Sequence, residues 1–133
     1  DITNITSPEG QHAVLRSLAH SQAFDMLVAQ VSISNSGWPF SDSPYTYWPD
    51  MFLDALMRVR QEVDKPIAVI LHSITNTREF ERLVRLRQKC QAAGVPVYDS
   101  IPGAALAIGR FLRHHQRNRD WVTARGCLRE GTP

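Results

Sequence analysis

The chain has 133 residues, of which 43% are hydrophobic and 21% are charged, a balance typical of globular proteins and unlike that of disordered or membrane-embedded chains. The length suits one domain with a modest core. The formal net charge of +2 is small, and Lys and Arg form no stripe with interleaved aromatic residues, so we expect no nucleic-acid partner. No apolar run approaches the ~20 residues that span a bilayer, so we expect no membrane partner.

The cysteines and the N-terminal segment indicate in which cellular compartment the protein is expected. Cys90 and Cys127 stand far apart without a CxxC or Cys/His spacing, so the sequence predicts neither a zinc site nor a disulfide, and the cytoplasm is the simplest compartment. Residues 1–7 lack the basic and apolar regions of a signal peptide and do not begin with Met. We therefore expect an excised piece of a longer protein, or one from which a tag was removed.

The first half of the chain predicts a helix, a strand and a long loop. Ser7-Pro8-Glu9 supplies a cap, a proline and an acid in the order that favours a helix start. Residues 24–33 form a short apolar run that is typical of a strand buried on both faces. Residues 34–44 are polar and rich in turn residues, and they predict an unusually long loop before the next helix.

The second half repeats the alternation of helices and strands. A helical face ends at Asp64-Lys65-Pro66, and a strand is expected at 67–71. A helix after 75–77 should end at Gly94, and the strand 95–98 should lie at a sheet edge because Pro96 cannot donate a ladder hydrogen bond. The expected core faces of the three later helices are Phe52, Ala55, Leu56, Val59 and Val63; Phe80, Leu83, Leu86, Cys90 and Ala93; and Ala104, Ala105, Ile108, Phe111 and Leu112.

Strands that alternate with long helices predict an α/β fold with a short parallel sheet in three α/β/α layers. Residues 1–116 should form this domain and residues 117–133 a basic C-terminal extension or linker, while Ile2 is a candidate for a fourth strand. Ligands of such sheets lie outside the carboxyl ends of the strands. Those ends are predicted at 34–37, 72–76 and 99–102.

Several common catalytic motifs are absent from the sequence. It contains no GxGxxG, no GxxxxGK[ST] and no GxSxG. Ser73 follows His72 at a strand end but has no evident acid to complete a triad, so a plain polar loop is the favoured interpretation. His114 and His115 are adjacent and suit a metal poorly, and His12 and His20 are expected at the surface. We predict no metal site and no catalytic residue in this chain.

The candidate binding residues are Ser34, Asn35, Ser36 and Gly37, which follow the first strand and precede a helix. Helix N-termini attract anions through unpaired N–H groups and the macrodipole, so these residues predict a phosphate or anion site. An ordinary long connection, with Trp38 and Phe40 packed on the body, explains the same residues. Exposed aromatic residues on this loop would instead indicate contact with another domain or chain.

Four segments of the chain, taken in order, carry a resemblance to a known family. They are Asp1-Ile2-Thr3; Phe24-Asp25-Met26-Leu27-Val28; Lys65-Pro66-Ile67-Ala68-Val69; and Ala93-Gly94-Val95-Pro96-Val97-Tyr98 followed by Ala104-Ala105-Leu106-Ala107. Over most of residues 1–113 the chain resembles the flavodoxin-like CoA-ligase domain of the NDP-forming acyl-CoA synthetases, relatives of succinyl-CoA synthetase. The resemblance implies a flavodoxin-like fold, complete or lacking its first βα units.

The resemblance also implies a function. Enzymes of this family are ligases that join a carboxylic acid to coenzyme A, driven by a nucleoside triphosphate through an acyl phosphate and a phosphohistidine. Their phosphorylated histidine lies in a Gly/Ser-His-x-Gly context, which none of the five histidines here matches. The chain is therefore expected to bind no cofactor alone, and coenzyme A and ATP/Mg are implied for the full enzyme, with the CoA-binding and ATP-grasp domains as partners.

Two hypotheses remain open. In the first, the chain is one module of a multidomain synthetase and is inactive alone. The helix start after residues 34–44 then corresponds to the one that faces the phosphohistidine, although Ser36-Gly37-Trp38 replaces the family's glycine-rich turn. In the second, the chain is a noncatalytic binding or docking module that uses Trp38, Phe40, Tyr45 and Trp48.

Overall fold

The computed structural model describes residues 5, 7–33, 48–72 and 77–129, and for Arg78 and residues 118–129 it describes the backbone alone. The chain divides into two compact units, Asp1–Asp99 and Ser100–Pro133. Ile2, the candidate for a fourth strand, lies outside the described residues. The predicted boundary after residue 116 stays a prediction.

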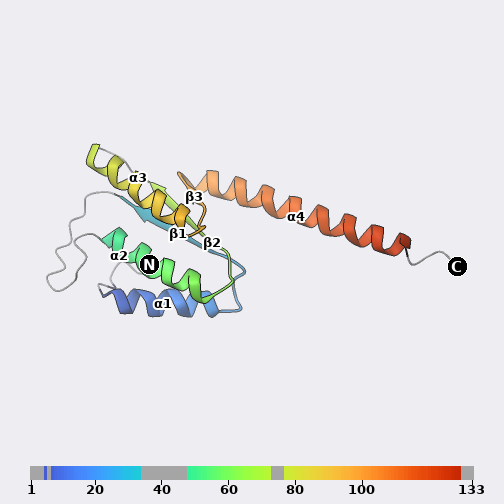
Figure 1. Ribbon diagram of the computed structural model, residues 1–133, viewed down its shortest axis with the longest axis horizontal. Helices are drawn as coiled ribbons and strands as arrows, with labels where there is room; N and C mark the ends of the chain where they lie inside the picture. The colour runs from blue at the N-terminus through green and yellow to red at the C-terminus, as the bar shows by residue number, and fades with distance from the viewer. Residues whose placement is uncertain (1–4, 6, 34–47, 73–76, 130–133) are drawn as a thin grey trace. The chain divides into compact units, whose positions relative to one another are not determined.

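The first unit contains a three-stranded parallel sheet (Figure 1). Strands β1 (Leu27–Ser32), β2 (Ile67–His72) and β3 (Val97–Tyr98) lie in the order β1-β2-β3. The register places Ser32 opposite His72 and Ile70 opposite Tyr98. Since every strand points the same way, the carboxyl ends of all three meet at one edge.

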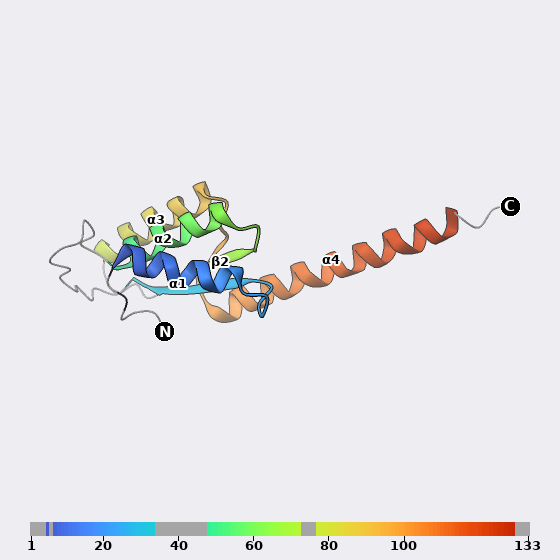
Figure 2. The same cartoon turned by 90° about the horizontal axis from the view of Figure 1, so that it is seen from below.

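Helices α1 (Pro8–His20), α2 (Trp48–Glu62) and α3 (Thr77–Ala92) lie on one face of this sheet (Figure 2). For α2 and α3 this layering follows from the strand order, because two right-handed crossovers that step in the same direction return on the same side. One apolar core joins the helices to alternate residues of the strands. Its fully buried members include Val31, Leu53, Leu56, Val59, Val69 and Leu86.

Capping residues set the ends of the helices where the sequence predicts them. Ser7 caps α1, since its Oγ accepts a hydrogen bond from the Gly10 N–H at 3.1 Å. At the end of α3, Gly94 has φ +69°, a left-handed conformation that suits glycine. The N–H groups of Gly94 and Val95 donate to the carbonyls of Gln91 and Cys90 at 3.0 and 2.9 Å, which satisfies two carbonyls of the last turn.

Expectations about burial are wrong at three places in this unit. β1 is not buried on both faces: Val28 is 48% exposed, and exposed and covered residues alternate along the strand. Among the described strands β1 pairs with β2 alone, so it is an edge strand with one face on the helices, whereas β2 is buried along nearly its whole length. Phe80 and Ala93, expected on the core face of α3, are both exposed, Phe80 to 54%, and neither belongs to the core.

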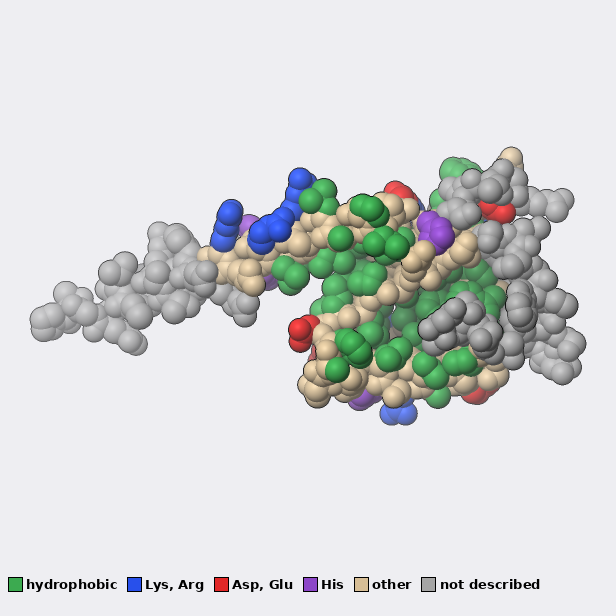
Figure 3. All heavy atoms as spheres, turned by 180° about the vertical axis from the view of Figure 1, so that it is seen from behind, with side chains coloured by type: hydrophobic (Ala, Val, Ile, Leu, Met, Phe, Trp, Pro, Cys, Tyr) green, Lys and Arg blue, Asp and Glu red, His purple; other side chains and the backbone are tan. Residues whose placement is uncertain are grey.

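The second unit is built on one long helix, α4 (Ile101–Arg129). Ser100 caps it, with its Oγ accepting from the Gly103 N–H at 3.1 Å. Phe111 and Leu112, expected inside, are 61% and 54% exposed, since a single helix has nothing of its own to bury an apolar stripe. Lys and Arg side chains project from the described part of α4 (Figure 3), where residues 110, 113 and 117 are exposed arginines.

The predicted fold class is confirmed: the protein is α/β, and its described residues form four helices and a short three-stranded parallel sheet, consistent with an incomplete flavodoxin-like fold. The first unit itself supplies two of the three predicted layers. Within the described ranges, no helix combines the length and the apolar character that crossing a membrane requires.

Candidate functional site at the carboxyl edge of the sheet

The carboxyl edge of the sheet is the place where a ligand of this fold is expected. The predicted anion-binding residues Ser34, Asn35, Ser36 and Gly37 follow β1 directly, but they lie outside the described residues, as does Ser73. The residues that the structure does describe at this edge are Gln30 and Ser32 on β1, His72 on β2 and Asp99 after β3. The anion site therefore stays a prediction. The described residues at the same edge of the sheet show which side chains lie near it.

Gln30 and His72 are brought together by the register of β1 and β2. Residues 28, 30 and 32 point away from the helices, and so does His72, which is paired in register with Ser32. The Gln30 Nε2 lies 2.7 Å from the His72 Nε2. An amide nitrogen can only donate, so the His72 Nε2 accepts, and in a neutral imidazole the proton then resides on Nδ1. With the amide nitrogen toward the ring, this contact thus favours the Nδ1-protonated tautomer of His72.

The other side of the edge is formed by the first turn of α2. Trp48 stacks on Phe52, with ring centroids 4.9 Å apart and planes inclined by 13°. Asp50 accepts hydrogen bonds from the Arg85 Nη2 at 2.9 and 3.2 Å through its two carboxylate oxygens. An acid in this turn already complements the positive end of the helix dipole, and Arg85 compensates its charge.

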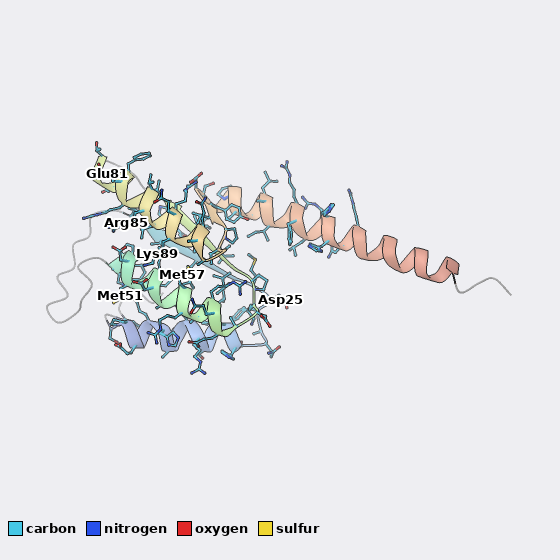
Figure 4. The ribbon with its side chains drawn as sticks, viewed as in Figure 1. Asp25, Met51, Met57, Glu81, Arg85 and Lys89 are labelled. Atoms are coloured by element: carbon cyan, nitrogen blue, oxygen red, sulfur yellow. The ribbon has the colours of Figure 1, made fainter. Side chains whose placement is uncertain are left out.

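Further ion pairs fix α3 beside its neighbours. Arg85 and Lys89 lie on the side of α3 toward α2 (Figure 4), where Lys89 pairs with Asp54 one turn beyond Asp50. Arg87 pairs with Asp99, which follows β3. These pairs are partly exposed, so each contributes little stability.

The other titratable side chains considered, His12, His20 and Cys90, contact neighbouring parts of the fold or are buried in it. The His12 Nε2 lies 2.8 Å from the Glu62 carboxylate, which also pairs with Arg16 at 3.2 Å and so links α1 to α2. His20 Nδ1 lies 2.9 Å from the carbonyl oxygen of Arg16. Cys90 is fully buried, and burial raises the pKa of its thiol, which disfavours the reactive thiolate.

The described residues contain no cluster of three or more His, Cys, Asp or Glu side chains that could hold a metal ion. On α4, the ring of His115 packs edge-on against Phe111, with centroids 4.6 Å apart. Among the described residues the candidate for binding is therefore the polar pair Gln30 and His72. The ion pairs of α3 connect this helix to α2 and to the residue after β3.

Comparison with known proteins adds no relative: no family model, no curated protein and no solved structure matches the chain.

Sequence reasoning missed the pairing of Gln30 with His72. The strand pattern alone predicts that residues 28, 30 and 32 share a face, and likewise residues 68, 70 and 72. Which residue of one strand meets which of the other depends on the register, and the register is set by the packing of the whole unit.

Proposed function

We propose that this chain is a module of a multidomain NDP-forming acyl-CoA synthetase, an enzyme that joins a carboxylic acid to coenzyme A with hydrolysis of a nucleoside triphosphate. The isolated chain is not catalytic in this proposal, because the phosphohistidine and ATP-grasp parts lie on other domains or subunits. Those domains are its partners, the cytoplasm is its compartment, and coenzyme A and ATP/Mg are ligands of the complete enzyme.

One observation carries the proposal. The segments that resemble the family enter successive strands of one parallel sheet: Leu27 and Val28 belong to β1, Ile67 to Val69 to β2, and Val97 and Tyr98 to β3. The resemblance thus follows the topology β1-β2-β3 and is not scattered over unrelated loops. Fold alone does not define function, so the order of these segments, and not the architecture, supports the ligase.

The docking alternative receives less support from the described residues. Of the aromatic residues that it needs, Trp48 stacks on Phe52 and packs against the core. Trp48 is therefore only partly exposed. Trp38, Phe40 and Tyr45 lie outside the described residues and do not separate the two proposals.

The test uses the complete gene product. We expect flanking sequence with an ATP-grasp segment and a His-x-Gly motif, and we expect the purified protein to release phosphate and nucleoside diphosphate only when both an acid and coenzyme A are supplied. An acid-labile phosphohistidine should form with the triphosphate alone. Flanking sequence that lacks both the ATP-grasp segment and the His-x-Gly motif would contradict the proposal.

Variants of the predicted anion site localise the contribution of this module. Asn35→Ala and Ser36→Ala in the complete protein should lower turnover about tenfold or more, as does loss of a polar group that stabilises developing charge. Ser21→Ala, between α1 and β1, is the matched control and should leave turnover unchanged. Unchanged turnover in both loop variants would remove residues 34–37 from the site.

A further inference from the structure

The Gln30–His72 pair lies at the edge where ligands of this fold bind, yet the proposed function assigns it no role. Gln30 is exposed and His72 is half-buried, so the pair is accessible to solvent. Both side chains are on the face of the sheet away from the α1–α3 core, since Val31, Val69 and Leu71 of the same strands belong to that core.

The hydrogen bond between the two side chains defines what the imidazole can offer. The Gln30 amide occupies the Nε2 lone pair at 2.7 Å, so the neutral ring keeps a proton on Nδ1. Within the described part of the chain His72 takes part in no ion pair, and its ring has Gln30 as its only recorded partner. Within the described residues the Nδ1–H thus has no acceptor of its own, and it can donate to a ligand.

An accessible imidazole N–H suits an oxygen anion as its acceptor, because the negative charge of the acceptor strengthens the hydrogen bond.

We propose that His72 binds an oxyanion, a phosphate or a carboxylate, through its Nδ1–H, and that Gln30 is the positioning residue that fixes the tautomer. The choice of these two oxyanions rests on the proposed function, because a synthetase of this class handles both a phosphoryl group and a carboxylic acid. His72 is in this assignment a binding residue, distinct from the phosphohistidine of another domain.

The experiment uses the full 133-residue chain, labelled with ¹⁵N at histidine. Long-range ¹H–¹⁵N spectra report the tautomer of each imidazole during titration with inorganic phosphate, with acetate, and with chloride at matched ionic strength. We expect the free chain to show His72 protonated at Nδ1 and accepting at Nε2. Phosphate or acetate should move the His72 Nδ1 resonance saturably, with a Kd on the order of 1–10 mM, while chloride should not.

Three variants make the assignment specific. His72→Phe should abolish the saturable response, whereas His20→Phe, the same change at an exposed histidine of α1, should preserve it. Gln30→Leu keeps the imidazole but frees its tautomer, so we expect a mixture of tautomers and an affinity reduced in proportion to the fraction of rings that lose the Nδ1 proton. Far-UV circular dichroism checks that each variant is folded.

The outcomes separate the possibilities. Saturation by phosphate alone assigns the site to the phosphoryl group, and saturation by acetate alone assigns it to the acid. Equal shifts of every histidine, or equal shifts with chloride, would overturn the site, and a free chain protonated at Nε2 or unchanged affinity in Gln30→Leu would overturn the role of Gln30. A complete gene product without synthetase activity but with an intact phosphate response would overturn the proposed function instead.

Discussion

Replacement of Gly94 by alanine isolates the conformational requirement at the end of α3. Gly94 has φ +69°, and a Cβ built there meets no atom within 4 Å. The change therefore adds no steric clash with the rest of the protein, and its cost is the strain of a left-handed alanine. That strain amounts to about 1 kcal/mol. Because Gly94 and Val95 together close the last turn of α3, the strain cannot be relieved without loss of their two hydrogen bonds.

The measurement is urea unfolding followed by circular dichroism, together with the melting temperature. For a unit of this size, about 1 kcal/mol corresponds to a fall in Tm of roughly 4–8 °C. Gly94→Asn should lose less, because asparagine tolerates the left-handed region.

Gly109→Ala is the matched control, since Gly109 lies inside α4 and an added Cβ meets the Arg113 side chain at an ordinary 3.6 Å. The same chemical change should there raise helix content, because alanine favours helix over glycine by about 1 kcal/mol. Equal stability of Gly94→Ala and the wild type would refute the positive φ at Gly94 as the reason for glycine.

Three further predictions follow from packing and charge. Leu56→Ala should lower the free energy of unfolding by about 3 kcal/mol, since Leu56 is 0% exposed, whereas Leu106→Ala, 52% exposed, should change it little in the same urea titration. A double-mutant cycle on Asp50 and Arg85 should give a coupling of about 0.5 kcal/mol that falls in 1 M salt, and a coupling unaffected by salt would contradict the partly exposed pair. Because burial raises the pKa of the Cys90 thiol above its unfolded value, its contribution to stability is full below the unfolded pKa and is lost as pH rises through the folded one. Stability of the wild type should therefore fall at alkaline pH relative to Cys90→Ala, and parallel pH profiles would argue against this linkage.

The sequence predicts the helix ends and the strands of this protein because these features depend on local chemistry. Ser7 stands where a helix cap is required, and Gly94 stands where a left-handed residue must end α3. Pro96 removes a ladder donor and correctly indicates that β3 is an edge strand. Each of these signals acts within a few residues of itself.

Burial on the outer faces could not be predicted in the same way. Val28 on β1, Phe80 on α3 and Phe111 on α4 all fit apolar patterns, yet each is about half exposed or more. An apolar pattern indicates that burial of a side chain would stabilise the protein. Burial also requires another element of the fold that packs against that side chain. Whether such an element lies there depends on which element neighbours which.

The candidate site also has features that the sequence predicts and features that only the tertiary structure shows. The sequence by itself predicted where β1 and β2 end, and the structure pairs the described ends Ser32 and His72 at one edge of a parallel sheet. The tertiary structure alone decided that Gln30 meets His72, and that Asp50 and Asp99 pair with Arg85 and Arg87. The reason is physical: a strand end is a local property of the chain, whereas the register between strands and the ion pairs between helices are fixed by packing distant segments into one core.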